Sequence, residues 1–193
     1  AGHTQLHHKV KLVIGVENTP TVIFDLMQFL VIDLGGVVGQ IGMGQHGTAF
    51  GHAGMRMGPA ICYEGLYGDF YGDFVRRGAQ FMAIISNDGW WGDTPGYKHL
   101  FTISRLRAIE HRRAIARSAN TGMSGFISAR GDIGETLGWE KRGVISAAVP
   151  LNSELTFYTR YGDYLGRISE YLTLLCVLYY IAYRVKRKNY LVK

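Results

Sequence analysis

The residue types and spacing around Cys62 are those of a covalent catalyst. Cys62 follows the apolar run Pro-Ala-Ile and precedes Tyr-Glu-Gly. We predict a strand over residues 59–63 that passes directly into a helix over residues 66–78. Such a sharp turn exposes the thiol, and the backbone N–H groups that follow it can bind an oxyanion. The sequence therefore predicts a nucleophilic cysteine, the alternative being the small buried hydrophobe that a free cysteine often is.

The elements expected around this cysteine form an α/β pattern. Residues 81–86 are an apolar run typical of a buried strand, and residues 97–112 carry apolar side chains at the spacing of a helix. A polar, aromatic loop over residues 87–96 joins them. Further strands are expected over residues 21–26, 30–34, 48–50 (within the glycine-rich stretch 35–58), 114–119, 125–129, 135–139 and 143–149, with a turn at residues 130–132. This order predicts a layered fold with a mixed sheet and no domain boundary before about residue 159.

The formal net charge of +6 is concentrated at the end of the chain. The last ten residues contain five basic side chains and no acidic one, so the rest of the chain is close to neutral. A milder arginine cluster over residues 105–117 lies in an amphipathic segment, where buried or paired arginines are as expected as a phosphate-binding face. We therefore expect no nucleic-acid partner.

The basic tail follows an apolar stretch, residues 171–183, that contains no charged residue. Counted from Ile168, the stretch is about 16 residues, or roughly 24 Å of helix, slightly short of a hydrocarbon core of about 30 Å. We predict a membrane-spanning helix, with a buried C-terminal core helix as the alternative. The expected organisation is a catalytic portion over residues 1–160, the span with its lead-in over 161–185, and a basic cytoplasmic tail over 186–193.

The ends and the cysteines of the chain add two expectations. Cys176 lies inside the apolar stretch, far from Cys62, so a disulfide between them is implausible. His7 and His8 would point to opposite faces of a strand. Neither the two cysteines nor the two histidines therefore have the spacing of metal ligands. The sequence begins Ala-Gly-His without a signal-type segment, and we interpret it as the C-terminal part of a longer, exported protein.

Several motifs together resemble one branch of the nitrilase superfamily, whose members use a Cys–Glu–Lys triad. PAICYE followed by a helix, and then ISNDGWWG, are similar to the superfamily at large. The branch of the apolipoprotein N-acyltransferases is indicated by four longer segments, HKVKLVIGVE, SNDGWWGD, HLFTISRLRAIEHRRAIARSANTG and FYTRYGDYLGR. The resemblance covers nearly the whole chain. It implies an α/β fold, a nitrilase-like αββα sandwich that is incomplete because its N-terminal part is missing, followed by one C-terminal transmembrane helix.

The resemblance also implies roles for particular residues. Cys62 matches the acylated nucleophile, and Lys9 matches the triad lysine because Glu17 follows it by the family's spacing of eight residues. Glu64 and Tyr63 match further positions important for activity. A lysine ammonium near the thiol favours the thiolate and can stabilise a tetrahedral oxyanion, while carboxylates can hold that ammonium and take up protons. The alternative for the charged residues is a solvated position on a strand.

Other matching positions carry less chemistry. Trp90, Trp91 and His99 are candidates for substrate contacts such as an acyl-chain opening, although core packing is at least as expected for them. The remaining matches we interpret as structural ion-pair and hydrogen-bond positions: Arg107, Arg113, Arg117 and Asn120.

The implied reaction is a ping-pong acyl transfer at the bacterial inner membrane, with the catalytic domain on the periplasmic side and the C-terminus in the cytoplasm. A phospholipid would donate its acyl chain to Cys62, and a diacylglyceryl-lipoprotein would accept it, without a metal or organic cofactor. One departure from the family matters most, because only eight residues precede Lys9 and none of them is the acidic triad base. Ile14 also replaces a usual proline, and His7 stands where an aromatic residue is common. A nitrilase-superfamily amidase and an inactive, membrane-anchored remnant remain the alternatives.

Overall fold

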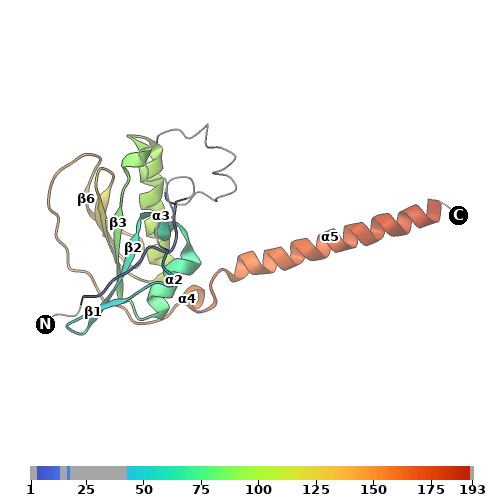
Figure 1. Ribbon diagram of the computed structural model, residues 1–193, viewed down its shortest axis with the longest axis horizontal. Helices are drawn as coiled ribbons and strands as arrows, with labels where there is room; N and C mark the ends of the chain where they lie inside the picture. The colour runs from blue at the N-terminus through green and yellow to red at the C-terminus, as the bar shows by residue number, and fades with distance from the viewer. Residues whose placement is uncertain (1–3, 14–16, 18–42, 192–193) are drawn as a thin grey trace.

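The computed structural model describes residues 4–13, 17 and 43–191. The strands expected over residues 21–26 and 30–34, and the first part of the glycine-rich stretch, lie outside these residues. Within them the chain builds one sheet with helices on one side, followed by a long separate helix (Figure 1).

The sheet is mixed, as predicted. Its order follows the chain from β1 to β6, and the central strands β2, β3 and β4 are parallel, whereas the outer pairings are antiparallel. The strands are β1 (Phe50–His52), β2 (Met55–Ile61), β3 (Phe81–Ser86), β4 (Ile115–Ala119), β5 (Ser124–Ile127) and β6 (Ile133–Leu137). Strand β3 has the predicted bounds, because its run of apolar residues is bounded by polar ones on both sides.

Two helices connect the parallel strands and cover the same face of the sheet (Figure 1). Helix α2 (Gly68–Arg76) joins β2 to β3, and α3 (Pro95–His111) joins β3 to β4. Two short 3₁₀ helices, η2 (Cys62–Leu66) and η3 (Gly89–Trp91), follow the ends of β2 and β3. The core lies between these helices and the sheet, where Tyr71 and Phe74 of α2 pack with Met82 and Ile115.

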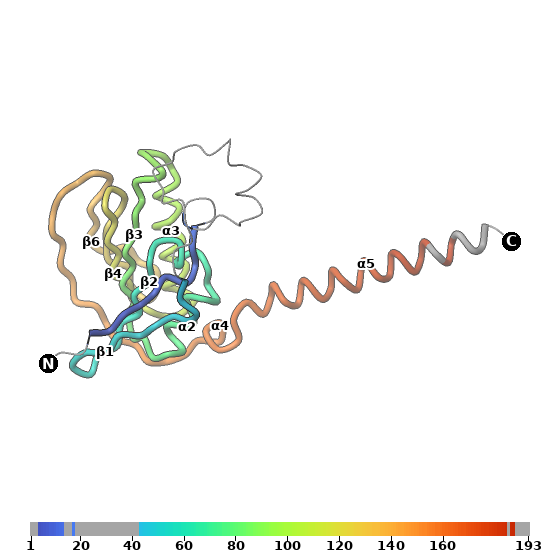
Figure 2. The backbone as a smooth tube through the Cα atoms, in the orientation of Figure 1, coloured from blue at the N-terminus to red at the C-terminus, as the bar shows by residue number. Residues whose placement is uncertain are grey.

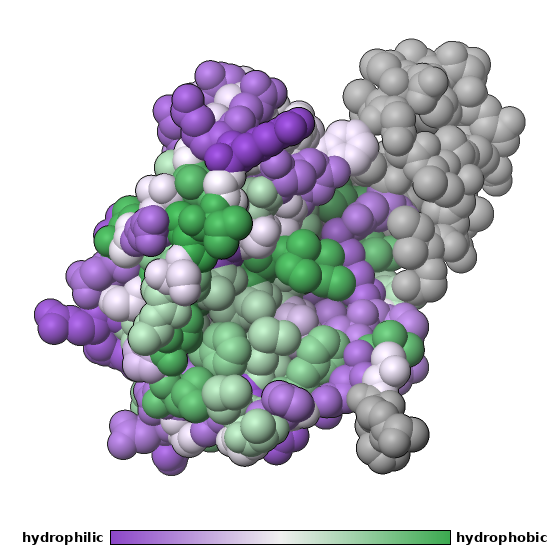
Figure 3. Space-filling model, turned by 90° about the vertical axis from the view of Figure 1, so that its left-hand side faces the viewer, coloured by the Kyte–Doolittle hydropathy of each residue, from purple (hydrophilic) through white to green (hydrophobic). Residues whose placement is uncertain are grey.

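The opposite face of the sheet is not covered by a helix in the described part of the chain. Because side chains alternate along a strand, Met82 and Ile84 of β3 point to the helices, whereas Ile85 points away from them and is 62 % exposed. Figure 3 shows hydrophobic side chains gathered on the side of the molecule that carries β6 and the segment after it. The strand expected over residues 143–149 is wrong for this chain, because that segment pairs with no described strand and leaves Val144 95 % exposed.

The chain ends in the short helix α4 (Phe157–Tyr161) and the helix α5 (Tyr164–Leu191). Helix α5 has 28 residues, about 42 Å at 1.5 Å per residue, and extends away from the sheet (Figures 1 and 2). Its section Tyr164–Arg184 is long and apolar enough to cross a membrane, and none of that section is buried against the protein. Within the part of the chain that the structure describes, this section therefore does not pack as a buried core helix.

Candidate active site

The sharp turn predicted at Cys62 is present. Strand β2 ends at Ile61, and Cys62 begins η2 with a φ of +48°. An L-residue in this left-handed region is disfavoured by about 1–2 kcal/mol, and such strain is found at functional sites where the surrounding structure enforces it. The Cys62 side chain is half-buried, so the thiol sits at the end of a parallel strand and at the surface of the domain. This is the backbone geometry of a nucleophile elbow.

Glu64 connects this turn to the N-terminal segment, residues 4–13. Its side chain is fully buried. Oε2 accepts the Ile61 N–H at 2.8 Å, which closes the turn on itself, and Oε1 accepts the Val10 N–H at 2.6 Å. His7 Nε2 lies 3.1 Å from Oε2 and 3.3 Å from Oε1. The carboxylate is therefore engaged by groups from both segments, which suits an anchor better than a group that exchanges protons.

Lys9 and Glu17, which the resemblance assigns to the site, form an ion pair. Lys9 Nζ lies 2.6 Å from each carboxylate oxygen of Glu17, and Oε2 of Glu17 also accepts the Val13 N–H at 2.8 Å. The two side chains are 12 % and 25 % exposed, so the pair is largely shielded from water. Lys9 directly precedes Val10, the residue whose N–H binds Glu64, and this places the lysine one residue from the contact with the Cys62 turn.

Aromatic side chains flank the start of α2 beside this turn. The ring of Tyr63 stands edge-on to that of Tyr67, with centroids 5.3 Å apart. Lys11 Nζ lies over the rings of Tyr67 and Phe70, at 5.3 and 5.5 Å from their centroids. Contacts of a cation with two aromatic faces stabilise the position of the lysine side chain.

Trp90, Trp91 and His99 are all exposed, so the alternative of core packing is wrong for them. The two tryptophans are 53 % and 48 % exposed and form η3, while His99 lies on the first turns of α3. A Cβ at Gly96 would meet the Trp91 ring, which therefore lies flat over the start of α3. No hydrogen bond between described residues joins these three side chains to Cys62, Lys9 or Glu64.

The loop that carries the tryptophans is held by a buried ion pair. The ion-pair role expected for Arg117 is confirmed, whereas its partner, Asp88, was not identified from the sequence. Asp88 is fully buried, and its two oxygens lie 2.9 and 3.0 Å from Arg117 Nη2 and Nη1. Ser86 Oγ donates to the same carboxylate at 2.6 Å, and the Asp88 N–H donates to Asn120 Oδ1 at 3.0 Å. An arginine in the middle of the mostly buried strand β4 indicates a buried, negatively charged partner, and this pattern could have led to Asp88.

The other matched arginines have structural contacts, as expected. Arg107 Nη1 lies 3.1 Å from Glu110 Oε2. Arg113 donates to backbone carbonyls, among them Ala79 O at 2.7 Å and Glu154 O at 2.9 Å. Burial lowers the pKa of Arg113 and raises the pKa of Glu110. These contacts tie α3 and the segment after β6 to the domain.

His111, which the sequence did not single out, joins three helices at the base of α5. Its Nδ1 lies 2.8 Å from Thr159 Oγ1 of α4 and its Nε2 lies 3.0 Å from Gly68 O of α2. Burial lowers the pKa of His111 to about 3. The positive charge of Arg107 also lowers this pKa, whereas the hydrogen bond to Gly68 raises it. The imidazole is therefore neutral at physiological pH, with a structural role.

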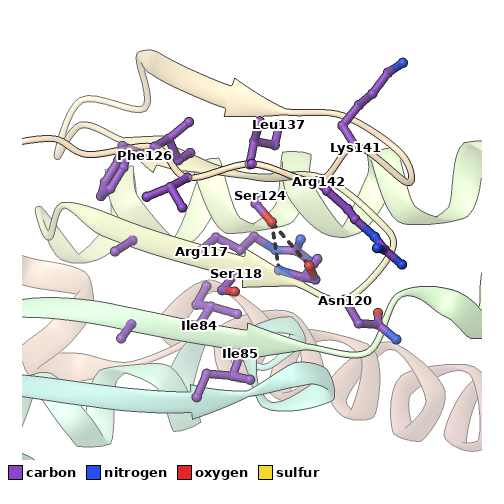
Figure 4. Close-up of a pocket in the computed structure, with 16 residues that line it drawn as sticks. Ile84, Ile85, Arg117, Ser118, Asn120, Ser124, Phe126, Leu137, Lys141 and Arg142 are labelled. Carbon is purple, nitrogen blue, oxygen red and sulfur yellow. Dashed lines mark hydrogen bonds between the residues drawn. The ribbon is translucent and has the colours of Figure 1, made fainter.

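A cavity of about 610 Å³ opens on the uncovered face of the sheet. Figure 4 shows Ile85 of β3, Ser118 of β4 and Phe126 of β5 along it, with Lys141 and Arg142 on the segment that follows β6. None of the site residues predicted from the sequence lines this cavity. Among the described residues, no group of three or more His, Cys, Asp or Glu side chains is placed to hold a metal ion.

The structure thus places a cysteine on a strained turn after a parallel strand and a lysine–glutamate pair on the adjoining N-terminal segment. The chain belongs to the carbon–nitrogen hydrolase family, whose family profile matches residues 2–155.

Among curated proteins, the chain is 37 % identical over 167 residues to the apolipoprotein N-acyltransferase of Chlorobaculum tepidum, covering 84 % of this chain and 31 % of that protein. It is 42 % identical over 97 residues to the apolipoprotein N-acyltransferase of Rhizobium meliloti, covering 50 % of this chain and 18 % of that one. The chain thus spans less than a third of the length of these relatives. Among solved structures, it is similar to Saccharomyces cerevisiae Nit3, a member of the nitrilase superfamily, with a TM-score of 0.48 and 19 % identity over 53 % of this chain and 41 % of that one.

Proposed function

We propose that this chain forms the nucleophile-bearing portion of an apolipoprotein N-acyltransferase. The observation that carries the proposal is the 37 % identity to a protein of that name over 167 residues. The family profile over residues 2–155 includes both the Cys62 turn and the Lys9–Glu17 pair. In the proposed organisation, residues 1–160 belong to the catalytic domain, residues 161–185 contain a membrane span, and residues 186–193 form a cytoplasmic tail.

In the first step the Cys62 thiolate attacks the carbonyl carbon of a phospholipid acyl ester. The C–S bond forms, the ester C–O bond breaks, and the lysophospholipid leaves after its oxygen takes up a proton. The Lys9 ammonium stabilises the oxyanion of the tetrahedral intermediate, and the backbone N–H groups after Cys62 assist it. Glu17 keeps the ammonium in place through two contacts of 2.6 Å. The base that receives the thiol proton is a carboxylate of the parent protein outside the described residues.

In the second step the α-amine of a diacylglyceryl-cysteine attacks the thioester. The C–N bond forms, the C–S bond breaks, the amine loses a proton and the thiolate is regenerated. The exposed Trp90 and Trp91, with His99 beside them, offer an apolar surface for the acyl chain where it enters the site. Helix α5 anchors the domain in the bacterial inner membrane, and the positive-inside rule places the basic tail in the cytoplasm and the catalytic domain on the periplasmic side.

The test is acyl labelling of the full-length parent protein. With a radiolabelled phospholipid, the native protein should acquire a label that hydroxylamine removes, as a thioester requires. Cys62→Ser should acquire none, and Cys176→Ser, which changes the cysteine in α5, should be labelled like the native protein. Undiminished label on Cys62→Ser would contradict the proposal.

A second measurement separates acyl transfer from hydrolysis, the reaction of the family's amidases. The labelled protein is mixed with a diacylglyceryl peptide that has a free α-amine, and the product is identified. Transfer of the label to the peptide supports the acyltransferase. Release of labelled free fatty acid at the same rate with and without the peptide supports the hydrolase. A Cys62 that resists small alkylating reagents in the folded protein would indicate an inactive remnant.

A further inference from the structure

His7 is a buried titratable side chain that the proposed reaction does not use. Its side chain is 2 % exposed, and Nε2 points at the Glu64 carboxylate from 3.1 Å. The ring stands edge-on to Phe74 of α2, with centroids 5.1 Å apart. The next residue, His8, is exposed, so the chain turns only the first of the two histidines towards the site.

The Glu64 carboxylate receives three donors from two parts of the chain. The N-terminal segment supplies His7 Nε2 and the Val10 N–H, and β2 supplies the Ile61 N–H directly before Cys62. A carboxylate only accepts hydrogen bonds, so the proton between the two side chains lies on Nε2. A buried carboxylate is stable only when such donors surround it. His7 is its side-chain donor among the described residues.

The order of these contacts along the chain matters for catalysis. Lys9 lies between His7 and Val10, the two residues of the N-terminal segment that bind Glu64. With contacts on both sides of the lysine, the segment cannot rotate or slide along the turn without breaking one of them. The same carboxylate fixes the turn at Cys62 through Ile61.

We propose that His7 is a positioning residue, which acts through Glu64 to hold the Lys9 ammonium at a fixed approach to the Cys62 thiol. The catalytic consequence rests on the proposed acyl transfer. The proposed effect on the thiol can be tested independently of the substrate, because an ammonium held close to a thiol favours the thiolate whatever the substrate is. The role depends on Nε2, since Nδ1 is buried and has no hydrogen-bond partner among the described residues.

Two amide variants test which nitrogen matters. A glutamine at position 7 places its amide nitrogen near the position of Nε2, whereas an asparagine places it near that of Nδ1. The variants are His7→Gln, His7→Asn and His7→Leu in the full-length protein, with His8→Asn as the matched control and Cys176→Ser as the common background. The measurements are the rate of Cys62 alkylation by iodoacetamide at pH 7, the thermal midpoint of unfolding, and kcat and KM for acyl transfer.

We expect alkylation to slow about tenfold in His7→Asn and His7→Leu, and to stay within about twofold of the background in His7→Gln and His8→Asn. We expect kcat to fall by about 100-fold in the two slow variants with little change in KM, because a misplacement of about 1 Å is that costly.

Unchanged alkylation in a folded His7→Leu, or equal rates in the Gln and Asn variants, would overturn the proposal. Loss of folding in His7→Gln would overturn it too, because ring packing on Phe74 would then be the requirement. A protein that shows the alkylation pattern but forms no acyl-enzyme would retain the positioning role and refute the acyltransferase.

Discussion

The buried pair of Asp88 and Arg117 allows a prediction whose size follows from its surroundings. Arg117→Met removes both guanidinium contacts with Asp88, at 2.9 and 3.0 Å, together with the hydrogen bond to Met123 O, while keeping an unbranched side chain. Asp88 would be left fully buried with Ser86 Oγ as its remaining side-chain donor. Removing one partner of a buried pair costs about 3–5 kcal/mol, because the other charge stays without compensation. For a domain of about 150–250 residues that unfolds cooperatively, this corresponds to a fall of roughly 6–20 °C in the thermal midpoint of that domain.

The assay is thermal unfolding of the full-length protein in detergent, followed by tryptophan fluorescence. The matched control is the double variant Asp88→Asn/Arg117→Met, in which the stranded charge is removed as well. It should recover at least half of the loss, since an amide is much less costly to bury than a carboxylate. A single variant that melts within 2 °C of the native protein, or a double variant as unstable as the single one, would refute the reasoning.

Two further predictions concern groups held in unusual states. The folded pKa of His111, about 3, lies below its unfolded value of about 6.5, so the unfolded state binds the proton more readily. The contribution of the neutral His111 to the free energy of unfolding is therefore complete above pH 6.5. It is lost as the pH falls, by about 1.4 kcal/mol per pH unit between 6.5 and 3. An imidazole NMR signal of His111 that titrates near pH 6.5 in the folded protein would contradict this. Separately, Cys62→Gly should be about 1 kcal/mol more stable than Cys62→Ala, because only glycine adopts a φ of +48° without strain. Comparison of the two thermal midpoints checks this, and a lower midpoint for the glycine variant would refute the strain argument.

The sequence was most informative where one local pattern decides the structure. The apolar run of β3 and the turn at Cys62 are both of this kind, because a buried strand followed at once by a helix leaves the chain little freedom. The segment over residues 143–149 is also mostly apolar but forms no strand, because a strand exists only with a partner and the described residues offer none. A helix needs no such partner for its backbone, and α3 was accordingly placed to within two residues.

The contacts between distant residues could not be predicted in the same way. The resemblance assigned Glu64 to the site, but its position in the sequence gives no indication that it binds the Val10 N–H, 54 residues away. Asp88 and Arg117 are 29 residues apart, and the sequence alone does not distinguish their pairing from that of any other opposite charges. The burial of His111 depends on α4, which follows it by almost 50 residues in the chain.

The separation between Val10 and Glu64 has a consequence for the synthesis of the protein. Chains grow at roughly 5–20 residues per second, so Lys9 leaves the ribosome about 3–10 s before the glutamate that fixes its segment. During that interval neither the lysine nor the turn has its final geometry. If the chain acts as proposed, the nucleophile is assembled only when these two segments have folded together, and the nascent chain is spared premature acylation.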